Sequence, residues 1–165
     1  MYITECYWGD YIGGTDDSLT LTAYLARKGK AEITVSEIFA DFGLDKLNGD
    51  FRRPEEPVCY TDSEGYEMAL GFAIDLVTDL AALLLECKVN GTLDLLALDD
   101  SLDAGEVAQP VIAIAAAPEE HRLIDRTLAD FAAAPERYDI SEMMGSEELA
   151  EMAGVCDRLR RELYE

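Results

Sequence analysis

The chain has 165 residues, of which 49% are hydrophobic and 29% are charged. Asp and Glu supply 35 residues and Lys and Arg supply 13, so the formal net charge is −22. The apolar fraction excludes a disordered acidic tail. The acidity excludes nucleic acid and anionic lipid as direct partners, because both are bound by clustered Lys and Arg. No stretch is apolar for the roughly 20 residues of a membrane span, and the length predicts a single domain over residues 1–165.

The cysteines and the N-terminal residues indicate a cytoplasmic protein without a metal. Residues 1–5 lack the basic region, the apolar segment and the cleavage site of a signal peptide. The cysteines are too widely spaced, and histidine too scarce, for an ordinary zinc site. In a reducing cytoplasm the cysteines are expected to be small buried residues, and we expect no cofactor. The residues concerned are Cys6, Cys59, Cys87, Cys156 and His121.

The acidity is concentrated in the middle of the chain. Residues 54–121 carry 15 acids and a single base, Lys88, a net charge of −14. Such a density costs self-repulsion in the folded state, which a basic partner, bound cations or a saline environment would offset. An acid-rich and Lys-poor surface is also expected from habitat or genome bias. An acidic housekeeping domain is therefore one alternative to a binding protein.

The first third of the chain predicts short elements separated by turn residues. Gly13-Gly14 and the neighbouring aspartates are typical of a loop, and Asp17 or Ser18 can cap a helix that stops at Gly29. The expected order is a strand over residues 1–8, a loop over 9–17, a helix to Gly29, an extended piece over 31–35 and a short helix over 36–42.

The middle of the chain predicts a hairpin followed by a core helix. Two short strands, residues 58–61 and 66–70, flank a turn. Residues 72–89 have the strongest helical pattern, because almost every position is apolar. The exceptions, Asp75, Asp79 and Glu86, form one stripe that we interpret as a solvated edge.

The last third predicts two strands and two helices. The expected order is a strand over 92–98, an acidic loop over 99–106, a strand within 107–117, a helix from Pro118 to Pro135, a single turn at 141–144 and a helix from Ser146. Pro118 suits the first position of a helix. The mixed order of elements predicts an α+β fold, with a mostly antiparallel sheet packed against a buried central helix and a C-terminal helix.

Few residues indicate catalysis. Asp75 and Asp79 lie one helical turn apart and could share a metal, and His121 could activate a nucleophile. However, no GxSxG elbow is present, and the aspartates at 99–103 lack the Gly and Glu of a calcium loop. A small metal-dependent or hydrolytic enzyme using Asp75, Asp79 and His121 is the alternative hypothesis, and it requires these side chains to converge on one pocket.

Several segments carry a resemblance to a known group of proteins. They are WGDYIGGTDDSLTL, SEIFADFGLDKLNGDF, AIDLVTDLAALLLECKVNG and the closing ELAEMAGVCDRLRRELYE, preceded by SEMM. Together they resemble small acidic bacterial immunity proteins of polymorphic toxin systems. The resemblance implies a cytoplasmic, non-enzymatic inhibitor that binds and masks a cognate toxin, often a cationic nuclease.

We therefore predict a basic protein as the partner and two segments as its binding surface. Exposed aromatics beside carboxylates are good interface anchors, and complementary charge speeds association. The aromatics are also suited to closing the core at the end of a strand, and that reading stays open. The predicted binding residues are Trp8, Tyr11, Asp16, Asp17, Asp99, Asp100 and Asp103.

Overall fold

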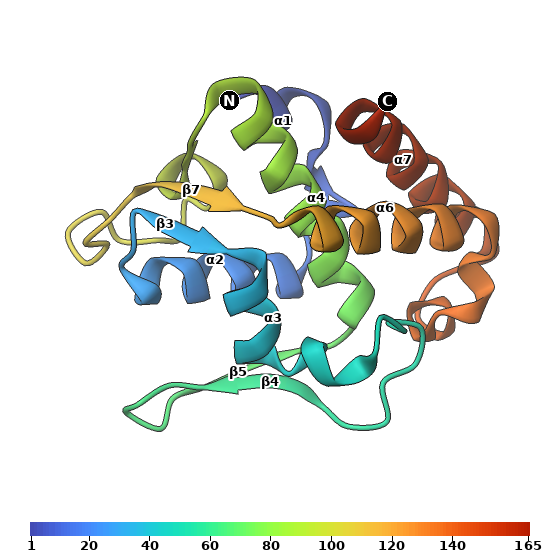
Figure 1. Ribbon diagram of the computed structural model, residues 1–165, viewed down its shortest axis with the longest axis horizontal. Coiled ribbons are helices and arrows are strands. Elements are labelled where there is room, and N and C mark those ends of the chain that lie inside the picture. The colour runs from blue at the N-terminus through green and yellow to red at the C-terminus, as the bar shows by residue number, and fades with distance from the viewer.

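Helix α4 (Ala73–Asn90) forms the centre of the fold (Figure 1). The computed structural model describes residues 1–165. All side chains from Ala73 to Glu86 are buried. Helices α1, α2, α6 and α7 and strands β2, β6 and β7 all contact α4. The predicted central helix is confirmed, and it belongs to one core of 40 buried hydrophobic residues.

Six further helices surround α4. They are α1 (Tyr2–Cys6), α2 (Asp16–Lys28), α3 (Val35–Phe42), α5 (Leu95–Leu98), α6 (Pro118–Ala133) and α7 (Ser146–Tyr164). Single 3-10 turns follow at Leu44–Leu47, Pro135–Arg137 and Asp139–Glu142. Helices α6 and α7 pack on each other and on α4. The C-terminal end of α7 lies near the N-terminus, at the same end of the molecule (Figure 1).

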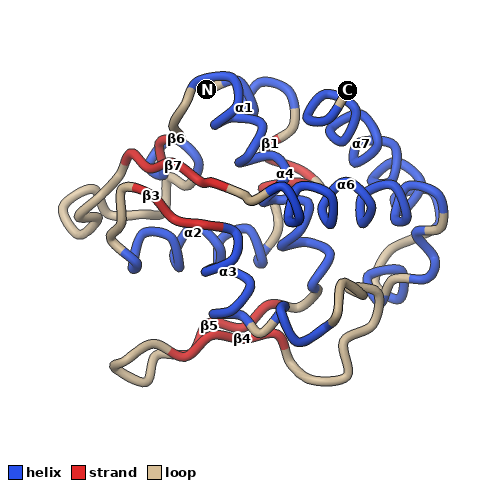
Figure 2. Tube along the Cα trace, viewed as in Figure 1, coloured by secondary structure: helices blue, strands red, loops and turns tan.

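The strands form three small sheets (Figure 2). They are β1 (Trp8–Asp10), β2 (Ile12–Gly13), β3 (Glu32–Thr34), β4 (Val58–Thr61), β5 (Glu67–Leu70), β6 (Leu93–Asp94) and β7 (Val111–Ala115). Strand β7 lies between β3, which runs parallel to it, and β6, which runs antiparallel. The β4–β5 hairpin is antiparallel and the short β1–β2 pair is parallel. The α+β class is confirmed, but the expected mostly antiparallel sheet is divided, with two of its four pairings parallel.

Helices α2 and α3 are found and end at the predicted glycines, but α2 is capped by Thr15 instead of Asp17 or Ser18, and α3 begins at Val35 instead of residue 36. The Thr15 side chain accepts a hydrogen bond from the Ser18 amide, and α2 ends at Gly29, whose φ is 62°. Thr34 caps α3 in the same way, and Gly43 ends it with a φ of 79°. Both helices therefore begin at a hydroxyl acceptor and end at a residue that tolerates the left-handed conformation.

Two predicted strands are wrong, and tertiary contacts explain both. Residues 2–6 are helical, because the Glu86 carboxylate of α4 accepts the free Ile3 amide at 2.9 Å and so satisfies the start of α1. The expected strand over 92–98 is limited to Leu93–Asp94. There the Asp94 carboxylate accepts the Leu96 amide and begins α5.

Candidate partner-binding surface

Trp8 joins the N-terminal segment to the start of the acidic loop, residues 99–106. Its indole Nε1 donates to the carbonyl oxygen of Leu98 at 3.2 Å. The indole also lies over Gly13, where a Cβ atom would fall 2.0 Å from the ring. Gly13 has a φ of 74° as well, so both space and backbone conformation require glycine there. Trp8 is thus a half-buried anchor between two loops that are 90 residues apart.

Two of the predicted binding residues face inward instead. Both oxygens of Asp17 accept backbone amides at the start of α4, from Gly71 at 2.7 Å and from Phe72 at 3.0 Å. Asp99 accepts the Thr22 hydroxyl at 2.6 Å and the Ser101 amide at 2.9 Å. The exposed fractions of Asp17 and Asp99 are 7% and 5%. Placing these two carboxylates on the partner surface is therefore wrong, because each is used to satisfy internal donors.

The other predicted residues remain on the surface. Asp16, Asp100 and Asp103 are exposed, and none of them takes part in an ion pair. The Tyr11 ring is half-buried, and its hydroxyl donates to Glu151 of α7 at 2.8 Å. The Thr22–Asp99 hydrogen bond brings α2 against the acidic loop. Trp8, Asp16, Asp100 and Asp103 therefore lie on elements that meet, whereas Tyr11 faces α7.

The acids of α4 are buried rather than solvated, which corrects the predicted polar edge. The exposed fractions of Asp75, Asp79 and Glu86 are 4%, 1% and 0%. Asp79 accepts the Gly13 amide at 2.9 Å, and Glu86 accepts the Ile3 amide. Both carboxylates hold the N-terminal segment against the core helix.

Asp75 and Asp79 each have one buried carboxylate oxygen without a hydrogen-bond partner. The Oδ1 atom of Asp75 and the Oδ2 atom of Asp79 have no hydrogen-bond partner. Burial, with the charges of Asp79 and Asp17, raises the pKa of Asp75 to about 9. Burial raises the pKa of Asp79 to about 7, although Ser18 and Gly13 oppose the shift. Asp75 therefore favours its protonated form at neutral pH.

His121 lies in a different part of the molecule. Its Nδ1 atom is 3.3 Å from the Tyr164 hydroxyl, and it lines an apolar hollow of about 510 Å³ together with Cys87, Lys88 and Ile114. Neither Asp75 nor Asp79 lines that hollow. No group of three or more His, Cys, Asp or Glu side chains is placed to hold a metal ion. The convergence that the enzyme hypothesis requires is absent.

One protein family matches almost the whole chain. The sequence profile of the family described as immunity protein 68 covers residues 2–163. The chain belongs to this family. The resemblance drawn from the sequence is confirmed, and the family indicates a toxin-inhibiting role. A search of curated proteins and a search of solved structures each returned no match. No helix has the length and apolar character needed to cross a membrane.

The exposed surface of this immunity protein contains residues that the sequence reasoning missed. Leu19 of α2 is 48% exposed and lies one turn before Thr22, whose hydroxyl donates to Asp99 at the start of the acidic loop. Tyr7 and Glu151 both line a surface groove between the N-terminal segment and α7. The helical spacing of Leu19 signalled an outward position, but the groove joins segments 140 residues apart and has no sequence signal.

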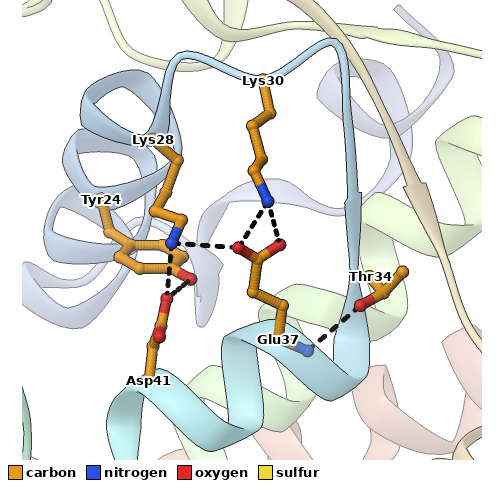
Figure 3. Close-up of polar contacts among 6 residues, drawn as sticks. All are labelled: Tyr24, Lys28, Lys30, Thr34, Glu37 and Asp41. Carbon is orange, nitrogen blue, oxygen red and sulfur yellow. Dashed lines mark hydrogen bonds and ion pairs between the residues drawn. The ribbon is translucent and has the colours of Figure 1, made fainter.

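One group of bases, at the end of α2, lies where carboxylates already meet it. Lys28 lies 3.0 Å from both Glu37 and Asp41, and Lys30 lies 2.7 Å from Glu37. Figure 3 shows the two ammonium groups directed at the Glu37 carboxylate, with Asp41 below Lys28. Nearby, Arg27 pairs with Asp62. This region is internally neutralised, in contrast to the acidic loop.

Proposed function

We propose that this chain inhibits a basic toxin by binding it through its unpaired acidic surface. The observation that carries the proposal is the acidic loop, in which Asp100, Asp103 and Glu106 are exposed and form no ion pair. A toxin that acts on nucleic acid has a cationic surface for phosphates, and such a surface would complement this loop. The encounter would take place in the cytoplasm, and it needs no catalytic group.

The surroundings of the loop support its use as an interface. Two hydrogen bonds fix the start of the acidic loop. Trp8 donates to the Leu98 carbonyl, and Thr22 donates to the Asp99 carboxylate. The loop backbone is therefore held before a partner arrives, which lowers the entropy cost of binding. The exposed Leu19 belongs to α2, whose Thr22 holds Asp99, and would add apolar area to the interface. Charge would govern association and the apolar contact would add affinity.

The first test uses the protein encoded by the gene adjacent to that of this chain. We expect co-expression to give a complex whose Kd weakens by about tenfold or more between 50 and 500 mM salt, because exposed charges are screened. We also expect the complex to suppress the toxic activity of the partner. A Kd unaffected by salt would contradict electrostatic capture.

A matched pair of triple variants locates the surface. Asp100→Asn/Asp103→Asn/Glu106→Gln removes three charges from the acidic loop. The control, Glu55→Gln/Glu56→Gln/Glu67→Gln, removes three exposed and unpaired charges near the β4–β5 hairpin. The loop variant should slow association by roughly tenfold at low salt, and the hairpin variant should leave most of the rate intact. Equal rates would place the interface elsewhere.

A further inference from the structure

A surface groove lies between the N-terminal segment and α7, and packing within the chain does not explain the glycine that lines it. It has a volume of about 440 Å³ and is lined by Tyr7, Asp10, Tyr11, Glu151, Gly154 and Arg158, among others. Gly154 lies in the middle of α7, and a Cβ atom built there would meet nothing within 4 Å. Its φ is not in the left-handed region. Alanine would fit this position and favour the helix, so packing within the chain does not explain the glycine.

The two tyrosines form fixed aromatic walls. The Tyr7 hydroxyl donates to Glu162 at 2.5 Å and the Tyr11 hydroxyl donates to Glu151 at 2.8 Å. Both acceptors belong to α7, so the rings are tied to the same helix that carries Gly154. Rings held in this way need little further ordering when a partner side chain enters.

The charge of the groove is uneven along its length. A hydrogen bond to Glu151, together with the charges of Glu151, Asp10 and Glu148, raises the pKa of Tyr11 to about 12. Two of these carboxylates, Asp10 and Glu151, line the groove together with Tyr11. The basic residue that lines the groove, Arg158, lies nearer to Tyr7, and its positive charge opposes the rise in the pKa of Tyr7. The Tyr11 end is suited to a cation, and its aromatic wall favours a planar one.

We propose that this groove is an anchor site for one arginine side chain of the toxin, stacked beside Tyr11 and paired with Glu151 and Asp10. The proposal rests on the proposed function and names the chemistry of the contact. Gly154 leaves room for the guanidinium to approach the helix. The groove and the acidic loop are joined by the segment from Tyr7 to Tyr11, because Trp8 within it contacts Leu98.

The first experiment needs only this protein and small probes. N-acetyl-arginine amide is titrated into the ¹⁵N-labelled protein to tens of millimolar, with N-acetyl-citrulline amide and N-acetyl-lysine amide as controls. We expect saturable shifts of the Gly154 and Tyr11 amide signals with the arginine probe, at least threefold larger than with either control. No shift, or equal shifts with citrulline or lysine, would overturn the assignment of an arginine site.

Matched variants then separate charge from shape. Glu151→Gln should reduce the response to the arginine probe by at least half, whereas Glu147→Gln, an exposed and unpaired acid on the same helix, should not. Gly154→Leu should abolish the response by filling the groove. Gly154→Ala, which the space permits, serves as the folded control, and thermal melts confirm that all four variants fold. A full response from Gly154→Leu would contradict the proposal.

The complex with the adjacent gene product completes the test. Gly154→Leu should weaken its Kd by tenfold or more, and Gly154→Ala by less than threefold. If the toxin binds equally well to both variants, the anchor site is wrong while the proposed function stands. If the arginine probe binds the groove but the adjacent gene product does not form a complex, the proposed function fails instead.

Discussion

The buried and the exposed carboxylates of this protein have opposite relations to the fold. Five acids, namely Asp17, Asp75, Asp79, Glu86 and Asp99, are buried around α4 and its loops. The acidic loop next to Asp99 instead presents Asp100, Asp103 and Glu106 to solvent. Chain neighbours such as Asp16 and Asp17 belong to different groups. The acidic residues therefore fall into two groups. The buried carboxylates hold loops in place, and the exposed carboxylates are available to a partner.

The difference lies in what each carboxylate oxygen accepts. Asp17 accepts two amides, and Glu86 accepts the Ile3 amide and the Asn90 side chain. The backbone donors among these lie at or just before the starts of helices, where no backbone acceptor is available. A buried carboxylate is stable only when such donors compensate its lost hydration. The exposed acids are hydrated by solvent and need no such partners, so the fold does not depend on them.

The largest expected effect comes from the adjacent pair Asp17 and Asp16. Asp17→Ala leaves the Gly71 and Phe72 amides without acceptors, so we expect a loss of about 2–3 kcal/mol in the free energy of unfolding. Asp16→Ala removes only a favourable charge at the start of α2, so its cost should stay below about 1 kcal/mol. Urea unfolding of the two variants measures both values. Equal losses would remove the distinction between inner and outer carboxylates.

The second prediction concerns the inner carboxylate that lacks full compensation. The pKa of Asp75 is raised to about 9, whereas an unfolded aspartate has a pKa of about 3.9. Between these values the folded state binds more protons, so the free energy of unfolding falls as the pH rises. The stabilising contribution is complete below about pH 4 and is lost as the pH approaches the folded pKa.

Asp75→Asn carries no charge at any pH and keeps the size of the side chain. At pH 8 we expect this variant to be more stable than the parent by at least about 1 kcal/mol, or roughly 2–4 °C or more in Tm for a chain of this size. At pH 4 the difference should vanish. Thermal melts across this range provide the measurement, and a variant less stable than the parent at pH 8 would show that Asp75 is ionised in the fold.

These inner carboxylates also mark where sequence reasoning stops. The elements α2, α3, α4, the hairpin and α7 follow from caps, turn residues and apolar periodicity, and all are found. A polar stripe on a helix has the same sequence pattern whether it faces water or the amides of a distant loop. The outward interpretation of Asp75, Asp79 and Glu86 was wrong for that reason. The short helix α1 depends on Glu86, which lies 83 residues away.

The candidate surface was predictable only in part for a related reason. Asp100 and Asp103 are exposed as expected, because an acidic loop has few internal donors to satisfy. Asp99 has the same residue type and is buried, since α2 places Thr22 within 2.6 Å of it. The groove beside Gly154 depends on the docking of α7 against the N-terminal segment. Such pairings are set by tertiary packing and have no local pattern.

The smallest expected effects divide the exposed carboxylates themselves into paired and unpaired groups. Glu37 lies within 3.0 Å of both Lys28 and Lys30, and these cations lower its pKa. Glu37→Gln should therefore destabilise the protein, but by no more than about 0.5 kcal/mol because the site is solvent-accessible. The effect should shrink in 1 M salt. Asp103→Asn removes the same charge from a site without cations, so it should leave stability unchanged or raise it slightly at low salt.

Urea unfolding at low and high salt compares these two variants directly, with Glu55→Gln as a second unpaired control. Opposite signs at low salt that converge at high salt would show that the acidic loop contributes self-repulsion to the free protein. The loop would then be retained at a small cost to stability, as expected of a surface kept for a cationic partner. Loss of stability from Asp103→Asn equal to that from Glu37→Gln would instead give the loop a structural role. That result would weaken the contrast on which the proposed interface depends.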